Sequence, residues 1–302
     1  MSAPAAVDPV PGRWAAALPR PRAFVCSGGA SLGSMQVGML RALGEAQIGP
    51  DLLVGTSVGA LNAAVTAHLG LVPAAVTRLE TIWRGLRRRE VFPGSVAAQI
   101  VHAARTGYLH PASGLETLIR RSLGARRFEE LALPLTVIAS EVLTGHVRRL
   151  STGQLVPALL AATALPGMFP PVTVDGSPLW DGGSVANVPL RAALDAGARS
   201  IVVLDVGDVC HLDELPRGFP DGLVLAMSTA MRQRVLVEAP LVAEEVPLVY
   251  LPRPCTRNRS LLDLDSSAEL IEPAYELAAA FLADAAVPVA GQMAGGPHAH
   301  HR

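Results

Sequence analysis

Hydrophobic residues along the chain fall into short runs that alternate with longer stretches at helical spacing. Residues 23–27 form an apolar run that ends at a glycine turn, and residues 31–46 then repeat apolar side chains every three or four positions. A second unit follows, with a strand predicted over 52–54 and an apolar helix over 60–68. Two successive strand-helix units indicate a mainly parallel sheet with helices on its faces.

Helices dominate the segment between residues 73 and 127. They are predicted over 74–89, 95–104 and 115–123, with glycine and proline between them. The first ends in a run of arginines, which is typical of a solvated helix C-terminus because cations suit the dipole there. A lid over a substrate pocket is a second interpretation of this segment, and the sequence leaves both open.

The second half of the chain continues with alternating strands and helices. A β-branched strand over 135–141 is followed by its hairpin partner over 147–150. A helix is predicted over 154–164, and a hairpin over 172–180 with an Asp-Gly turn leads to Asp181. The remaining predicted elements are helices over 189–196, 223–238 and 266–285, and strands over 201–206 and 248–251.

Length and composition fit one domain. The chain has 302 residues, of which 50% are hydrophobic, and this allows a single large core. We expect a flexible tail over 1–22, without the pattern of a signal peptide, and a single domain over 23–285. A disordered, histidine-containing tail is expected over 286–302.

Charge, cysteines and hydropathy limit the partners and the compartment. A formal net charge of -1 gives no field that would attract nucleic acid. Cys26, Cys210 and Cys255 are odd in number and widely spaced, so they predict neither a disulfide framework nor a zinc site and fit a reducing cytoplasm. Residues 52–76 and 152–174 lack Asp, Glu and Arg, but glycines and prolines interrupt them; we interpret both as buried strands and helices.

One serine lies at the turn between the predicted strand over 52–54 and the helix that follows. The run Gly55-Thr56-Ser57-Val58-Gly59 is a Gly-x-Ser-x-Gly arrangement, in which the flanking glycines supply room and unusual backbone dihedrals. Such a turn exposes the hydroxyl, so Ser57 is a candidate nucleophile. A serine nucleophile also requires a base and donors for the oxyanion.

The donors are expected in the first glycine turn. The run Ser27-Gly28-Gly29-Ala30-Ser31-Leu32-Gly33 joins a strand to a helix, where successive amides and the helix dipole can face an anion. A phosphate-binding loop is the alternative, but the run matches neither Gly-x-Gly-x-x-Gly nor a Gly-Lys-Ser/Thr signature.

Two residues are candidates for the base. A histidine late in the chain would follow the order of α/β-hydrolases, but His211 lies in a polar loop and Ser57 comes too early for that fold. Asp181 ends a predicted hairpin with two glycines behind it. A carboxylate within hydrogen-bond reach can act as a general base, so Asp181 is the better candidate.

These blocks together resemble the patatin-like phospholipase family. The similarity runs in order from about residue 24 to residue 190 and is carried by Ser27-Gly28-Gly29 to Gly33, by Gly55 to Gly59, and by Asp181-Gly182-Gly183 with Asn187 and Pro189. Residues 165–171, just before the acid, also resemble the Pro-Gly-x-Phe-Pro-Pro approach of that family.

The resemblance implies a three-layer α/β/α fold and lipid acyl hydrolysis by a Ser-Asp dyad, with no histidine, metal or other cofactor. The substrate would be a lipid or other acyl ester, reached by transient contact with a membrane surface. Carried over by position, Ser57 is the nucleophile, Asp181 is the base, and the amides of Gly28, Gly29 and Ala30 form the oxyanion hole. The supporting glycines are Gly33, Gly55, Gly59, Gly182 and Gly183.

Two positions depart from the family pattern. Ala30 stands where the family usually has a third glycine, and Leu32 stands where it usually has a basic residue. A cation near the oxyanion would stabilise its charge, so Leu32 motivates the hypothesis of a weakly active lipid-binding protein that retains the fold. A third hypothesis is an acyltransferase, since the same acyl-enzyme can pass its acyl group to an alcohol, amine or thiol.

Overall fold

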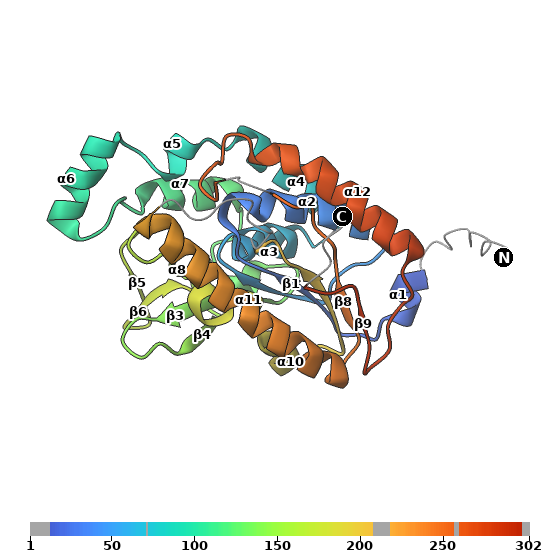
Figure 1. Cartoon of the computed structure of the whole chain (residues 1–302). Coiled ribbons are helices and arrows are strands. Elements are labelled where there is room, and N and C mark those ends of the chain that lie inside the picture. The colour runs from blue at the N-terminus through green and yellow to red at the C-terminus, as the bar shows by residue number, and fades with distance from the viewer. Residues whose placement is uncertain (1–12, 71, 208–217, 257–259, 298–302) are drawn as a thin grey trace.

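The computed structural model describes residues 13–70, 72–207, 218–256 and 260–297. Its centre is a sheet of nine strands (Figure 1). They are β1 (Arg22–Cys26), β2 (Leu52–Thr56), β3 (Leu135–Glu141), β4 (Val147–Leu150), β5 (Val172–Val174), β6 (Ser177–Asp181), β7 (Ser200–Leu204), β8 (Leu248–Tyr250) and β9 (Met293–Ala294).

The sheet is mainly parallel, as predicted. Its order is β5-β6-β3-β2-β1-β7-β8-β9, with β4 paired to β3 outside this path. The run from β3 to β9 is parallel throughout, whereas β4, β5 and β6 pair in antiparallel fashion at one side. Consequently β6, which ends at Asp181, lies next to β3, and β3 lies next to β2.

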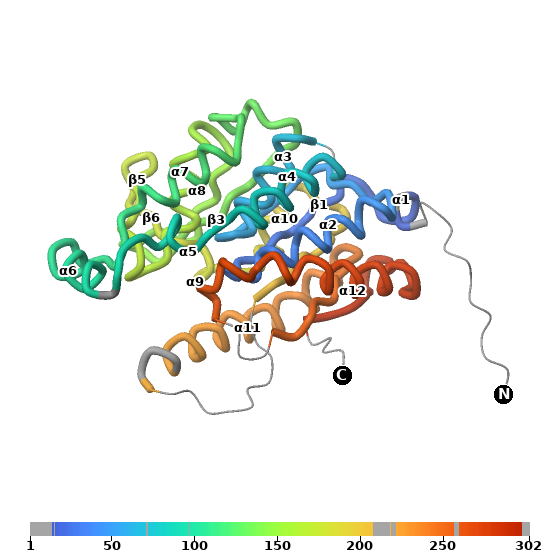
Figure 2. The backbone as a smooth tube through the Cα atoms, turned by 90° about the horizontal axis from the view of Figure 1, so that it is seen from above, coloured from blue at the N-terminus to red at the C-terminus, as the bar shows by residue number. Residues whose placement is uncertain are grey.

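Helices cover both faces of the sheet (Figures 1 and 2). The α-helices are α1 (Arg13–Ala17), α2 (Met35–Glu45), α3 (Val58–Leu69), α4 (Val72–Gly85), α5 (Arg88–Val91), α6 (Val96–Thr106), α7 (Ser113–Ser122), α8 (Leu155–Thr163), α9 (Gly183–Ala186), α10 (Leu190–Asp195), α11 (Phe219–Glu245) and α12 (Ile271–Asp284). Short 3-10 helices are η1 (Ala30–Ser34), η2 (Phe128–Glu130) and η3 (Ser267–Leu270). The expected helix over 74–89 is divided in two, because the chain leaves α4 after Gly85 and starts α5 at Arg88.

Two hydrophobic cores lie on opposite faces of the sheet. Successive residues of β1 alternate between them, with Phe24 packed in the larger core and Val25 in the smaller one. The larger core receives side chains of α2, α3, α4, α7, α8 and α12, and the smaller receives those of α10 and α11. A strand buried on both faces needs apolar residues at every position, which explains the uninterrupted runs in the sequence.

The expected tails are shorter than predicted. Trp14 is 2% exposed, and its Nε1 donates a hydrogen bond of 2.8 Å to the carbonyl of Leu282 on α12. The flexible tail over 1–22 is therefore wrong for residues 13–22. The tail over 286–302 is likewise wrong where β9 pairs with β8, while residues 1–12 and 298–302 lie outside the described part.

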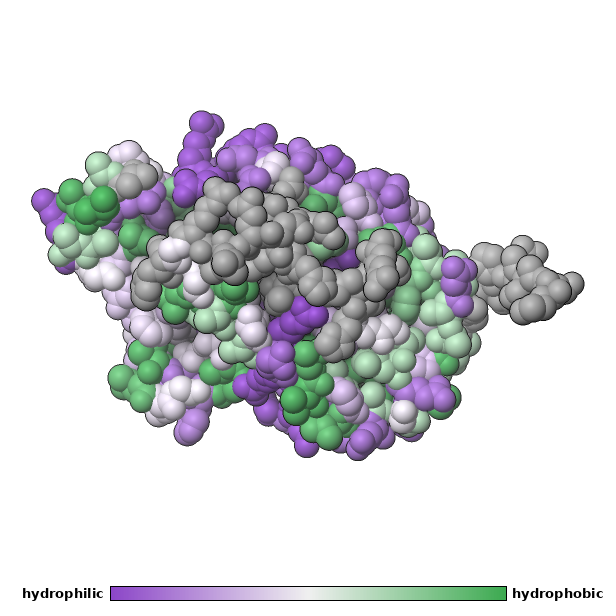
Figure 3. All heavy atoms as spheres, viewed as in Figure 1, coloured by the Kyte–Doolittle hydropathy of each residue, from purple (hydrophilic) through white to green (hydrophobic). Residues whose placement is uncertain are grey.

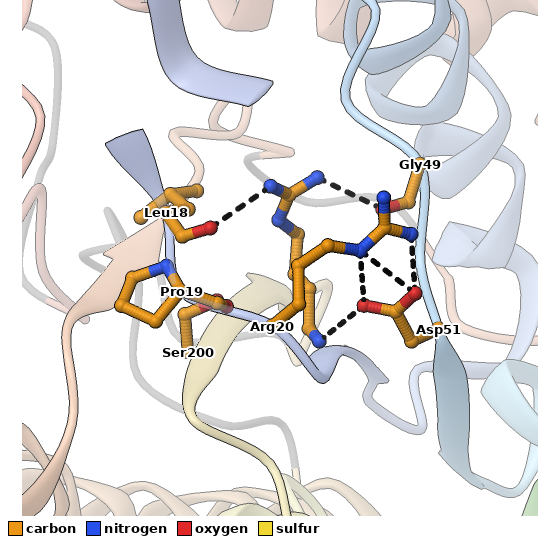
Figure 4. A network of polar contacts seen from close by, with 7 residues as sticks. Leu18, Pro19, Arg20, Gly49, Asp51 and Ser200 are labelled. Atoms are coloured by element: carbon orange, nitrogen blue, oxygen red, sulfur yellow. Dashed lines mark hydrogen bonds and ion pairs between the residues drawn. The ribbon is translucent and has the colours of Figure 1, made fainter. Parts of the chain in front are cut away.

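Polar contacts fix the start of β1 against the start of β2 (Figure 4). The Arg22 guanidinium is almost fully buried and donates to the carbonyls of Gly49, at 3.0 Å, and Leu18, at 3.2 Å. The backbone amide of Arg22 donates to Asp51 at 2.7 Å, and Arg20 forms an ion pair with the same carboxylate. Because the bonds to Gly49 and Asp51 join the first residue of β1 to residues just before β2, they oppose a slip in register.

Within the described residues, no helix is both long and apolar enough to cross a bilayer. The two apolar stretches instead form β2, α3 and the start of α4 in one case, and α8 and β5 in the other. The cysteine prediction is partly wrong, because Cys255 is disulfide-bonded, while Cys26 is free and buried in the sheet.

We predict that Gly38→Ala destabilises the fold. A Cβ at Gly38 on α2 would lie 2.1 Å from the carbonyl oxygen of Ile271 and 2.7 Å from the amide nitrogen of Tyr275 on α12. Alanine favours a helix more than glycine does, so any loss of stability in the variant is due to the steric clash. Urea denaturation should show a loss of about 1–3 kcal/mol. Gly85→Ala, where nothing lies within 4 Å of the added atom, is the matched control and should show no loss.

Candidate active site

Ser57 lies in a strained turn between β2 and α3. Its φ is 53° and its ψ is -131°, a conformation that L residues rarely adopt. The turn places Ser57 at the N-terminus of α3, where the helix dipole favours negative charge. The strain and the dipole are the features expected of a nucleophilic serine, and the side chain is half-buried.

The glycines that flank Ser57 are required for close approach of the backbone. A Cβ at Gly59 would lie 2.3 Å from the carbonyl oxygen of Cys26, and one at Gly55 would lie 2.6 Å from the Cα of Ala60. Neither glycine has positive φ, so the expectation that they supply the unusual dihedrals is wrong. The serine itself carries the unusual dihedrals.

Asp181 reaches Ser57 from the end of β6. The Ser57 hydroxyl donates to Asp181 Oδ2 at 2.6 Å, and the Gly183 amide donates to Oδ1 at 2.8 Å. Asp181 pairs with Ala139 on β3, and a Cβ at Gly182 would lie 2.5 Å from the carbonyl oxygen of Ile138 on that strand. The sheet therefore brings together the two residues that the sequence singled out.

The Asp181 carboxylate is 2% exposed. Burial raises its pKa to about 6, and the hydrogen bonds from Ser57 and Gly183 oppose this rise. A carboxylate with a pKa near 6 is ionised at neutral pH but accepts a proton more readily than an ordinary aspartate, which suits a general base.

The loop from Gly28 to Gly33 lies beside Ser57. A Cβ at Gly28 would lie 3.0 Å from the Cβ of Ser57, and one at Gly33 would lie 2.5 Å from Cγ2 of Val58. The Gly28 amide, however, donates to the carbonyl of Asn187 at 3.2 Å. The Gly28 amide is therefore already engaged. Of the three predicted oxyanion donors, the amides of Gly29 and Ala30 remain as candidates, since they donate to no acceptor within the described residues.

The two departures from the family pattern have different structural consequences. Ala30 has a φ of 49°, in the left-handed region where glycine is favoured, so its backbone is strained. Leu32 is fully buried in the larger core, between the loop and α2. Its side chain contributes packing at this position, where a cation would have no room to remain solvated.

A buried polar network supports this loop, and it was not predicted from the sequence. Gln36 Nε2 donates to the carbonyls of Ser27, at 2.9 Å, and Leu204, at 3.0 Å. Asn62 Nδ2 donates to the Gly33 carbonyl at 2.9 Å and to Gln36 Oε1 at 2.8 Å, while Asn62 Oδ1 accepts from Trp83 Nε1 at 3.1 Å. Amide side chains on otherwise apolar helices are the signal that could have identified this network.

An apolar cavity lies beside Ser57 and is partly open to solvent. One stripe of α3 forms a wall, with Val58, Leu61 and Val65 at helical spacing. Other lining residues come from α4, α5, α7 and α8 and from the loop that contains Leu261 and Leu264. Of the helices between residues 73 and 127, α4, α5 and α7 contribute to the cavity wall, whereas α6 contributes no lining residue. The arginines at the end of the first predicted helix are exposed, as expected for a solvated helix end.

No histidine is among the described residues that line the cavity. His110 is buried against the rings of Phe92 and Phe169, which line the cavity, but His110 itself is not one of the lining residues. The alternative base His211 lies outside the described residues, as does the rest of its polar loop. In the described ranges, no group of three or more His, Cys, Asp or Glu side chains could hold a metal ion.

The sequence matches the family model for patatin-like phospholipases over residues 24–194. The match covers more than half of the chain and includes Ser57, Asp181 and the loop from Gly28 to Gly33. The chain belongs to the patatin-like phospholipase family. The fold agrees with this assignment, since a mainly parallel sheet lies between two layers of helices.

Similar proteins cover much of this chain but are much longer than it. Patatin-like phospholipase domain-containing protein 7 of Rattus norvegicus is 29% identical over 192 residues, which are 61% of this chain and 13% of that protein. Lysophospholipase nte1 of Aspergillus terreus is 28% identical over 207 residues, which are 66% of this chain and 13% of that protein. The crystal structure of VipD from Legionella pneumophila aligns with 88% of this chain and 67% of its own, at 15% identity and a TM-score of 0.45.

The raised pKa of Asp181 predicts a specific dependence of stability on pH. The folded protein favours the protonated Asp181 carboxyl. The contribution of this carboxyl to stability is therefore greatest below 3.8, its pKa in the unfolded chain, and is lost as the pH rises through about 6, its pKa in the folded protein. Asp181→Asn is neutral at every pH and removes this loss. Relative to wild type, the variant should gain on the order of 3 kcal/mol in unfolding free energy between pH 4 and pH 7. A difference that stays constant over this range, measured by chemical denaturation, would contradict the pKa shift.

Proposed function

We propose that this patatin-like chain is a serine hydrolase that cleaves carboxylic esters of lipids through an acyl-enzyme on Ser57. The observation that carries the proposal is the 2.6 Å hydrogen bond from the Ser57 hydroxyl to the buried Asp181 carboxylate, beside an apolar cavity. A serine bonded directly to an ionisable base has the geometry needed for nucleophilic attack.

In the first half of the reaction, Ser57 Oγ attacks the ester carbonyl while its proton passes to Asp181 Oδ2. The oxygen of the tetrahedral intermediate becomes an oxyanion, and in this proposal the amides of Gly29 and Ala30 stabilise it. The bond to the leaving alcohol then breaks, and Asp181 returns the proton to the alcohol oxygen. The products are a free alcohol and an acyl group on Ser57.

In the second half, a water molecule replaces the alcohol. Asp181 takes a proton from the water, whose oxygen attacks the acyl carbonyl, and the same two amides stabilise the second oxyanion. Collapse of this intermediate restores the Ser57 hydroxyl with the proton from Asp181 and releases a carboxylic acid. One ester and one water thus give one alcohol and one acid.

The cavity supports a fatty acyl chain as the group bound beside Ser57. Its walls are mostly aliphatic and aromatic side chains, and burial of each methylene contributes about 0.8 kcal/mol. The family name and the lysophospholipase among the relatives support phospholipids or lysophospholipids as the lipid class. The aligned part of the chain spans only 13% of the length of those relatives, so the activity proposed here concerns this domain alone.

We predict that Ser57→Ala and Asp181→Asn each abolish ester hydrolysis without unfolding the protein. Loss of the nucleophile or of its base should reduce kcat by roughly 10⁴-fold or more. The assay is release of fatty acid from a lysophospholipid and from a soluble fatty acyl ester.

Ser113→Ala provides the matched control, since Ser113 is an exposed serine at the start of α7. It should retain wild-type activity. Wild-type rates in either site variant, with the fold verified by circular dichroism, would show that the chemistry occurs elsewhere.

A further inference from the structure

Helix α6 stands apart from the rest of the structure. Figures 1 and 2 show it projecting at one end of the molecule, beyond α5 and α7. None of its side chains whose burial is described is buried, whereas the flanking helices α5 and α7 bury Val91 and Leu118. An isolated helix of 11 residues is marginally stable in water, so α6 lacks the packing that normally stabilises such a helix.

The sequence nevertheless specifies this helix at both ends. Ser95 caps its N-terminus by accepting a hydrogen bond from the Ala98 amide at 3.4 Å. Gly107 ends it with a φ of 83°, the left-handed conformation usual after a helix. Residues at its own two ends therefore stabilise α6, while its side chains stay accessible to solvent or to a partner.

The exposed surface of α6 is amphipathic. Ala97, Ile100, Val101 and Ala104 follow helical spacing along one stripe, with Ile100 62% exposed and Val101 52% exposed. Arg105 borders this stripe. The methylene groups of its side chain can lie along an apolar surface while the guanidinium stays in a polar environment. Figure 3 shows hydrophobic residues gathered on this projecting end of the molecule.

The segment that contains α6 carries mainly positive charge. Residues 84–115 contain five arginines, which are Arg84, Arg87, Arg88, Arg89 and Arg105, and one carboxylate, Glu90. The Glu90 carboxylate is already bound by Arg121, with both bonds at 2.9 Å. All five arginines are exposed, and none of them forms an ion pair within the described part of the chain.

The position of α6 connects this surface to the cavity. The chain enters α6 from α5 and leaves it toward α7, and both of these helices line the cavity, through Val91 and Leu115 for example. The first turns of α11 lie at the same end of the molecule in Figures 1 and 2 and expose further apolar side chains, including Leu223 and Val224.

We propose that α6 is a docking surface for a membrane that contains anionic phospholipids. The apolar stripe inserts between lipid headgroups, and the arginines contact phosphate groups that no carboxylate of this segment competes for. A second copy of the chain fits less well, since a symmetric contact would bring two sets of five arginines together. Docking at α6 would bring the lipid surface close to the helices that enclose the cavity.

Co-sedimentation with vesicles tests this proposal, and Ser57→Ala protein keeps the test independent of hydrolysis. The full chain should bind vesicles of phosphatidylglycerol and phosphatidylcholine more tightly than vesicles of phosphatidylcholine alone, and added salt should weaken that binding. The double substitution Ile100→Asp with Val101→Asp, and separately Arg89→Glu with Arg105→Glu, should each weaken binding about tenfold or more.

The matched control is Val237→Asp with Leu241→Asp on α11, where the side chains are 66% and 56% exposed. These substitutions should leave binding unchanged, and circular dichroism should show that all variants are folded. The proposal is overturned if the full chain does not bind anionic vesicles, or if the control pair weakens binding as much as the α6 pair does. Failure of hydrolysis in the wild-type chain would bear on the proposed function and not on this surface.

Discussion

The hydrogen bond between Ser57 and Asp181 joins two residues that are 124 positions apart in the sequence. The Asp181 carboxyl of this pair is buried, and burial disfavours its charged form. Two donors, the Ser57 hydroxyl and the Gly183 amide, compensate in part by binding one oxygen each. The carboxylate therefore depends on the serine for its solvation, and the serine depends on the carboxylate for a base.

Close contacts between backbone segments hold this pair in place. Gly59 lies against the carbonyls of Cys26 and Ser27, Gly182 lies against that of Ile138, and Gly28 lies against the side chain of Asn187. At each point a Cβ would overlap its neighbour, so the glycines of the three sequence blocks allow loops from different strands to meet. The strained dihedrals of Ser57 and Ala30 persist because this packed surrounding determines them.

Much of the fold and the site could be predicted because local patterns determine them. The strand-turn-helix at Ser57, the hairpin that leads to Asp181 and the parallel order of the first strands all follow from periodicity and glycine placement. The engagement of the Gly28 amide by Asn187 could not be predicted, since it depends on a distance between segments far apart in the chain. The burial of Trp14 against α12 was missed for the same reason.

Helix α6 illustrates a further limit of local patterns. The arginine-rich segment before α6 is typical of a solvated helix end. Only the structure shows that α6 itself buries none of its side chains whose burial is described. Leu32 is a contrasting case, because the side chain at this departure from the family pattern proves to be buried in the core. In both cases the tertiary surroundings decide what the side chain does.

The most direct test of the Ser57–Asp181 pair is to identify the residue that a fluorophosphonate probe modifies. The chain contains no lysine, so trypsin releases residues 42–78 as one peptide, in which Ser57 is the single serine. We predict one covalent adduct on this peptide in the wild-type protein, no adduct in Ser57→Ala and strongly slowed labelling in Asp181→Asn. Folded wild-type protein that remains unlabelled, or that is labelled on another peptide, would contradict the account.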